Sequence, residues 1–282
     1  MTRVTVVVFV ALAAMACRTD PPLVQVAQAR DRSADLAVQF ITAADAANKA
    51  IMAETDEASA RFVREAEAAK QAVRSDIESL QPVLLDLHYT RESELLRAFA
   101  AQFDDYSKLD DQILVLATEN TNRKAQRLSF GPGFTEADAF RDAIDALVRA
   151  SGADAWRIRA LAATAVAAVR EIQALQAPHI AEAGDAAMTE MEKRMAVAEA
   201  SARSALRELA PLVGAPRLAT ANAALDRFMK AHAEITALSR RNTNVRSLAL
   251  ALNEKGKLTA SCERSLRELR DALAKRGFTA TR

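Results

Sequence analysis

Two stretches of this chain decide the fold, DDYSKLDDQILVLATENTN at residues 104–122 and DRFMKAHAEITALSRRNTN at residues 226–244. They agree at seven of nineteen aligned positions, more than a shared alanine-rich composition explains. A second match, 129 residues apart, pairs Arg74, Ser75, Leu80 and Pro82 with Arg203, Ser204, Leu209 and Pro211. We therefore expect an internal duplication of two three-helix units, residues 17–150 and 151–276.

The composition favours helices throughout. The 282 residues include only seven Gly and seven Pro, and they are half apolar with 5% aromatic residues. Alanine and leucine are strong helix formers, whereas a large sheet needs more aromatic and β-branched residues. The predicted fold class is all-α, an elongated antiparallel helical bundle or bundles of long helices.

The spacing of apolar residues predicts where the helices run. Small and apolar side chains recur every three or four residues over 41–80, which predicts one unbroken helix from about residue 23 to residue 80, about 85 Å long. Pro82 should end or kink it. A second helix should stop at a turn, Gly131-Pro132-Gly133, and Thr135 should cap a shorter helix that reaches about Ala150. Pro178 and Gly184 should bend or interrupt the second long helix.

The first residues predict export. Residues 1–16 contain Arg3 and an uncharged apolar run at 4–15, as in a signal peptide. Cys17 follows small residues, as in a lipobox, which predicts lipidation of Cys17 and a periplasmic protein anchored to a membrane, with the outer membrane favoured. The same residues also suit ordinary signal peptidase and a soluble periplasmic protein, in which case Cys17 and Cys262 could form a disulfide. Residues 277–282 are expected to form a flexible tail.

The charge balance excludes some partners. Loss of residues 1–16 removes one arginine and no acid, leaving 37 basic and 37 acidic residues. A neutral chain does not favour nucleic acid as a partner. After Cys17 no further apolar run has the length of a transmembrane helix.

Six polar residues on or beside the apolar stripes are candidate ligand contacts. Asn120 and Asn242 lie on equivalent stripes, where a buried amide either fixes which helices pair or forms the polar floor of a pocket. Asp110 and His232 occupy one equivalent position and suit either ligand contact or a partly solvated core. Arg74 and Arg203 could hold a carboxylate, or cover apolar surface and pair with nearby acids.

No motif in the sequence predicts catalysis. His88, His179 and His232 are isolated, and the chain lacks HExxH, CxxC, GxSxG, a Walker loop and GxGxxG. We therefore expect no enzyme, no metal and no cofactor.

Residues 109–148, LDDQILVLATENTNRKAQRLSFGPGFTEADAFRDAIDALV, resemble the closing part of the four-helix-bundle sensor domain of methyl-accepting chemotaxis receptors. Residues 235–273 show the same pattern. The resemblance implies a periplasmic bundle that binds small solutes, usually at a dimer interface. The chain departs from that family in lacking transmembrane helices, the linker module and the signalling hairpin. The expected function is a sensor-like module for a small solute or protein partner. The alternative is a structural spacer that docks envelope proteins or a second copy of itself.

Overall fold

The computed structural model describes residues 22–151 and 155–276, and all elements in these ranges are helical. Their order along the chain is α1 (Pro22–Met52), α2 (Asp56–Asp86), α3 (Thr90–Glu119), α4 (Thr121–Leu128), η1 (Ser129–Gly133), α5 (Phe134–Arg149), α6 (Ala155–Ala181), α7 (Asp185–Val213), α8 (Ala215–Arg241), α9 (Thr243–Leu250), η2 (Ala251–Lys255) and α10 (Gly256–Arg276). The predicted all-α, elongated bundle fold is confirmed. None of these helices has a stretch long and apolar enough to span a bilayer.

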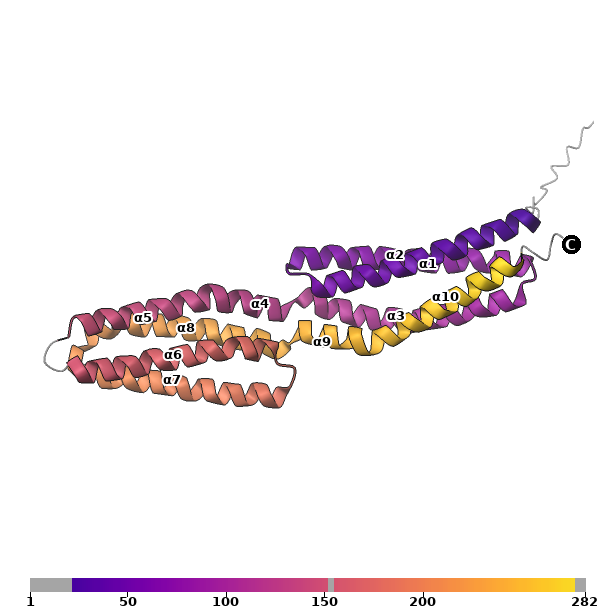
Figure 1. The fold of residues 1–282 in the computed structure, drawn as a ribbon. Coiled ribbons are helices and arrows are strands. Elements are labelled where there is room, and N and C mark those ends of the chain that lie inside the picture. The colour runs from indigo at the N-terminus through magenta and orange to yellow at the C-terminus, as the bar shows by residue number, and fades with distance from the viewer. Residues whose placement is uncertain (1–21, 152–154, 277–282) are drawn as a thin grey trace, which may run out of the picture.

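The helices form two bundles placed end to end (Figure 1). The first bundle consists of α1, α2, α3 and α10, with α9 and η2 leading into α10. The second bundle consists of α5, α6, α7 and α8, with α4 and η1 leading into α5. The described chain begins and ends at the same outer tip of the first bundle, where Arg30 Nε donates to the carbonyl oxygen of Leu273 at 3.2 Å.

Each bundle has its own core. In the first, Phe40, Phe99, Phe103 and Tyr106 pack with ring centroids 5.2–6.2 Å apart. Burying each such ring contributes roughly 1.5 to 3 kcal/mol. The α1–α2 hairpin beside them is lined by buried alanines, which let the two helix backbones approach closely. The second core contains Phe140 and Phe228 among many buried alanines, leucines and isoleucines.

The expected division at residue 150 is not where the packing divides. The connection near residue 150 joins α5 to α6 inside the second bundle, whereas the two bundles meet at residues 120–122 and 242–244. Each half of the chain contributes helices to both bundles. Helix α5, from the first half of the sequence, packs on α8 in the second bundle, and α10, from the second half, packs on α3 in the first bundle. The two halves do follow the same order of elements, and the duplication itself stays an interpretation of the sequence match.

The predicted unbroken helix over 23–80 is wrong. The chain turns back at residues 53–55, and α1 and α2 pack against each other as a hairpin. Thr55 caps α2, since its hydroxyl accepts a hydrogen bond from the amide of Ala58 at 3.1 Å, and Asp56 and Glu57 follow in the first turn. The second half breaks at the corresponding place, between α6 and α7, with Gly184 as the cap residue. An interruption was predicted here from Pro178 and Gly184; the break lies at Gly184, whereas Pro178 lies inside α6.

Pro82 does not end its helix, because α2 continues to Asp86. Nor do Gly131-Pro132-Gly133 form a turn. Residues 129–133 are a π-helical segment that joins α4 to α5 without a break, and Thr135 lies inside the helix with its hydroxyl bonded to the carbonyl of Gly131. A wider π-turn accommodates a proline that has no N–H to donate. The matching segment in the other half, 251–255, is also π-helical.

Candidate functional site

The two bundles meet at a waist, which we define as residues 120–122 and 242–244. Here the two long helical paths, α3 into α4 and α8 into α9, cross between bundles. Asn120 and Asn242 adopt the same left-handed conformation, with φ of 52° at each. Asparagine tolerates this region better than other non-glycine residues, so each Asn ends one helix and redirects the chain into the next.

A reciprocal hydrogen-bond network joins the two Asn-Thr-Asn segments. The amide of Thr121 donates to the hydroxyl of Thr243 at 3.1 Å, and the amide of Thr243 donates to the hydroxyl of Thr121 at 3.2 Å. In the same way the amides of Asn122 and Asn244 donate to each other's side-chain oxygens at 3.0 and 3.1 Å. The first orphan N–H groups of two helices are thereby satisfied by the opposite segment.

The Asn side chains complete this network. Asn122 Nδ2 donates to Asn242 Oδ1, and Asn244 Nδ2 donates to Asn120 Oδ1, both at 2.8 Å. Asn122 Nδ2 also donates to the carbonyl of Ile180 at 2.7 Å. Asn120 and Asn242, two of the predicted site residues, therefore lie together and fix which helices meet.

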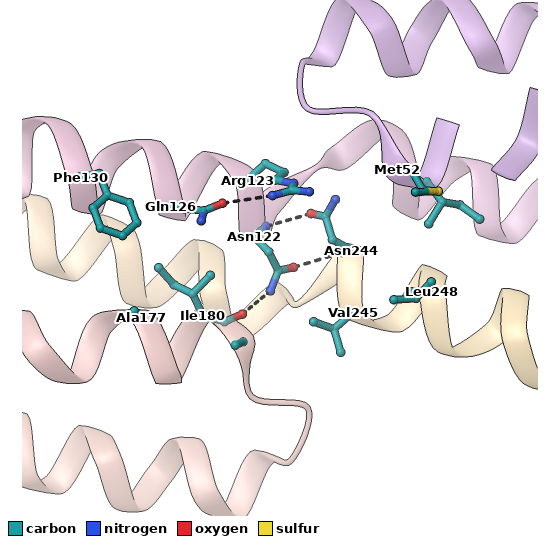
Figure 2. A pocket seen from close by; sticks show the side chains of 12 residues that line it. Met52, Asn122, Arg123, Gln126, Phe130, Ala177, Ile180, Asn244, Val245 and Leu248 are labelled. Carbon is teal, nitrogen blue, oxygen red and sulfur yellow. Dashed lines mark hydrogen bonds between the residues drawn. The ribbon is translucent and has the colours of Figure 1, made fainter. Parts of the chain in front are cut away.

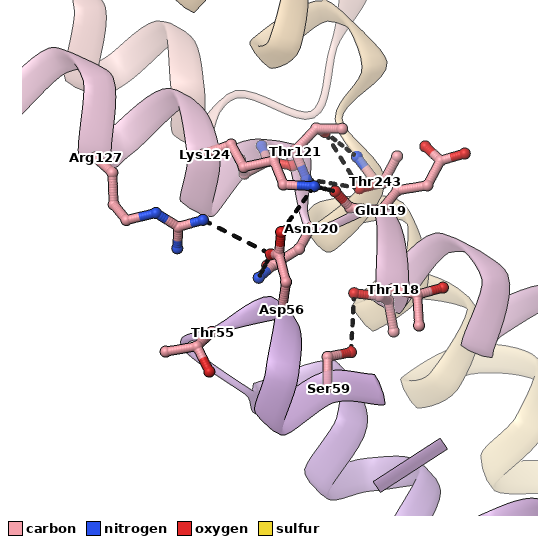
Figure 3. A network of polar contacts seen from close by, with 12 residues as sticks. Thr55, Asp56, Ser59, Thr118, Glu119, Asn120, Thr121, Lys124, Arg127 and Thr243 are labelled. Carbon is pink, nitrogen blue, oxygen red and sulfur yellow. Dashed lines mark hydrogen bonds and ion pairs between the residues drawn. The ribbon is translucent and has the colours of Figure 1, made fainter. Parts of the chain in front are cut away.

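Each Asn is also tied to a helical hairpin. Asn120 Nδ2 donates to Asp56 Oδ1 at 3.0 Å, and Lys124 and Arg127 form ion pairs with the same carboxylate at 3.0 and 3.6 Å (Figure 3). Burial alone would raise the pKa of Asp56, but hydrogen bonds from Lys124 and Asn120 outweigh it and lower the pKa below 3.8. On the other side, Asn242 Nδ2 donates to the carbonyl of Glu182 at 2.8 Å.

A pocket of about 500 Å³ opens beside this network (Figure 2). Asn122 and Asn244 line it, with apolar side chains from α1, η1, α6 and α9 and further polar side chains from α4, so both bundles contribute to its walls. The lining residues are Ile51, Met52, Asn122, Arg123, Gln126, Phe130, Ala177, Ile180, Ala181, Asn244, Val245 and Leu248. Its size and largely apolar wall with a few polar groups are typical of small-molecule sites.

A second hollow of about 420 Å³ continues from the first along the groove between α1 and the path from α9 to α10. The two hollows share Ile51, Met52 and Leu248. Met52, Phe130 and Leu252 on these walls expose 73%, 66% and 72% of their surface. The two hollows beside the waist therefore form a contiguous apolar surface.

No family model, curated protein or solved structure matches this chain.

Asp110, another predicted site residue, lies in the first bundle apart from the waist. It is fully buried, and its carboxylate lies 2.6 Å from Lys255 Nζ and 3.2 Å from Lys70 Nζ. Burial lowers the pKa of Lys255, and the attraction of Asp110 offsets this only in part. Burial also opposes the charge of Lys70, but hydrogen bonds to Asp111 and Glu67 outweigh it and raise the pKa. The hydroxyl of Tyr106 has no hydrogen-bond partner among the described residues.

His232 lies at the equivalent place in the second bundle. Nδ1 of His232 is 3.5 Å from Nε2 of Gln176, and Oε1 of Gln176 accepts a hydrogen bond from Ser129 Oγ at 2.7 Å. The ring of His232 stacks on that of Phe228, with 6.4 Å between the ring centroids. Burial lowers the pKa of His232, so its neutral form is favoured. Asp110 and His232 thus have polar partners inside separate bundles, and the fold does not bring them together.

Arg74 and Arg203 lie in separate bundles, in protein contacts. Arg74 Nη2 donates to Ser107 Oγ at 3.1 Å, with the guanidinium over the ring of Phe103. Arg203 pairs with Glu199 at 2.8 Å and Asp226 at 3.0 Å. Neither arginine lines the waist pocket.

A Ser-His-Glu arrangement in the second bundle was not predicted. His179 Nδ1 is 2.8 Å from Ser239 Oγ, and His179 Nε2 is 2.9 Å from Glu192, which Arg240 also holds at 2.6 Å. Ser239 is fully buried and donates its own proton to the carbonyl of His179 at 2.9 Å. These contacts join α6, α7 and α8 inside the second bundle.

Most residues of the waist were not predicted as site residues. Thr121, Asn122, Thr243 and Asn244 appeared only as matching letters of the repeat, although an identical polar triplet at the end of two apolar stripes was a usable signal. Lys70 and Lys255 were missed because a lysine beside an apolar stripe usually reaches solvent. No group of three metal-binding side chains occurs in the described ranges. Cys17 and residues 1–16 lie outside those ranges, as does the tail at 277–282, whereas Cys262 is buried in the first core.

Proposed function

We propose that this chain is a binding module of the cell envelope that takes a small, largely apolar solute in the waist pocket. The observation that supports this proposal is that a pocket of about 500 Å³ is lined by both bundles and lies against the network that joins them. A ligand there would contact α1 on one side and α6 on the other. Its binding energy would therefore depend on the angle between the bundles, which is what a sensor-like module requires.

The export signal, lipidation at Cys17 and a periplasmic location remain part of this proposal on sequence grounds. A lipid on Cys17 would anchor the chain close to the outer tip of the first bundle, because the described chain begins there. The second bundle and the waist would then extend away from the membrane.

The test is a thermal-shift screen of the mature chain against organic acids, amino acids, fatty acids, alcohols and peptides. A ligand present at a hundred times its Kd should stabilise the folded chain by about 2.7 kcal/mol. Ala177 is an exposed wall residue of α6, and Ala174 is exposed on the same helix outside the pocket. Ala177→Phe should abolish the shift and Ala174→Phe should preserve it. If no compound shifts the melting temperature of the well-folded chain, the solute-binding proposal fails.

A second candidate is a spacer that docks a protein partner or another copy through the waist. The observation that favours it is the exposure of Met52, Phe130 and Leu252 on one contiguous surface. Light scattering during gel filtration separates the alternatives for self-association. A dimer that Phe130→Ser converts to a monomer would support docking, whereas a monomer at all concentrations would exclude a homodimer.

A further inference from the structure

The waist pocket contains one positive charge, that of Arg123, with no acidic partner among the described residues. Arg123 lines the pocket, and within the described ranges its side chain bonds to the neutral Gln126, at 3.3 Å (Figure 2). The neighbouring cations differ, because Lys124 and Arg127 both pair with Asp56. The described residues that line this pocket include no aspartate or glutamate. A guanidinium in an apolar wall with no carboxylate of its own is complementary to an anion.

The rest of the wall is suited to hydrocarbon. Ile51, Ile180, Val245, Leu248 and Phe130 surround the space beyond Arg123, and the hollow continues between α1 and α9. A small, fully hydrated anion would gain nothing from these side chains. An apolar body on the same molecule would gain affinity from each methylene that it buries there, about fourfold per methylene.

From this arrangement we infer that the ligand is an amphipathic monocarboxylate, held by its carboxylate on Arg123 and by its hydrocarbon chain in the waist pocket. The two parallel N–H donors of a guanidinium match the two oxygens of a carboxylate, which fixes the head. The hydrocarbon chain of the ligand would lie against Ile180 and Leu248, and a longer hydrocarbon chain would follow the groove past Met52. This inference rests on the proposed function, since it names the ligand class of the same pocket.

The test is calorimetric titration of the mature chain with decanoate and, separately, with 1-decanol, which has the same chain without the charge. Decanoate should bind at least tenfold more tightly than decanol. Arg123→Met removes the guanidinium but keeps an apolar side chain of similar length. It should weaken decanoate about tenfold and leave decanol unchanged. The matched control is Arg207→Met, since Arg207 is an exposed arginine that lines none of the described pockets, and it should change neither affinity.

A second pair of variants tests where the hydrocarbon chain of the ligand binds. Ala177→Phe fills the pocket from α6 without touching Arg123 and should abolish binding of both probes, whereas Ala174→Phe should preserve it. Octanoate should bind about fifteenfold more weakly than decanoate, because it buries two fewer methylenes.

The outcomes separate this inference from the proposed function. One outcome is that decanoate and decanol bind equally, that Arg123→Met has no effect, and that Ala177→Phe abolishes binding of both probes. In that case the carboxylate inference is overturned, while the pocket remains a site for apolar solutes. If decanoate binds and Ala177→Phe does not weaken it, the site lies elsewhere and the inference is overturned. If neither probe binds, the inference is overturned, and the wider thermal-shift screen then decides the proposed function.

Discussion

Replacing Asn122 by alanine is the sharpest test of the waist. The side chain makes three hydrogen bonds, donating to Asn242 at 2.8 Å and to the carbonyl of Ile180 at 2.7 Å, and accepting from the amide of Asn244 at 3.1 Å. A net contribution of about 1 kcal/mol per bond gives about 3 kcal/mol. The higher helix propensity of alanine offsets roughly 0.5 kcal/mol of this. We expect Asn122→Ala to lower the free energy of unfolding by about 2.5 kcal/mol.

The assay is urea unfolding of the mature chain followed by circular dichroism at 222 nm, with Asn253→Ala as the control. Asn253 is exposed and its side chain makes no hydrogen bond within the described residues, so its loss should cost less than about 0.5 kcal/mol. The double variant Asn122→Ala/Asn244→Ala should cost less than the sum of the two single variants by about 1 kcal/mol, because the two residues bond to each other. A loss for Asn122→Ala no larger than that of Asn253→Ala would refute the view that this network holds the bundles together.

Three further predictions concern the cores and the pH dependence. Phe103→Ala removes a fully buried ring that contacts three other aromatic rings, Phe40, Phe99 and Tyr106, and should cost about 4 kcal/mol in the same urea assay; a cost below 1 kcal/mol would contradict the packing. Asp110→Ala leaves the ammonium groups of Lys70 and Lys255 without their buried anion and should cost about 3 to 5 kcal/mol at pH 7, whereas replacement of the exposed Asp105 should be nearly neutral. The folded pKa of Asp56 lies below its unfolded value of 3.8, so its contribution to stability is present above that pH and is lost as the pH falls through the folded pKa. Asp56→Asn should therefore flatten the fall in stability below about pH 4, and an unchanged acid limb would show that the carboxylate contributes nothing.

Several features of the site could be predicted from local chemistry. A repeated Asn-Thr-Asn at the end of two apolar stripes marked the two places where the chain later meets itself. Asn120 and Asn242, which were expected either to set helix pairing or to form a pocket floor, both lie in the network between the bundles. The prediction did not include Asn122 and Asn244, which supply the reciprocal bonds, because a sequence shows a polar triplet but not the direction of each side chain.

The helix boundaries show the limit of periodicity. Thr55, Asp56 and Glu57 indicate the start of a new helix. The stripe of small residues continues through them at helical spacing, however, and this spacing indicates an unbroken helix. Packing resolves the conflict, because a hairpin buries the alanine faces of α1 and α2 against each other. The opposite happened at Gly131-Pro132-Gly133, where strong turn residues were kept in a helix by neighbours on both sides.

By itself, the sequence determined an all-helical chain, because abundant alanine and leucine with few glycines and prolines leave helices as the favoured backbone. It also determined where polar residues interrupt the apolar faces. Only the tertiary structure decided that α10 returns to the first bundle, that α5 leaves for the second, and that Arg123 lies in a pocket without an acid. The physical reason is that alanine-rich apolar stripes are nearly interchangeable as packing partners, so the choice among them depends on long-range contacts that no local spacing encodes.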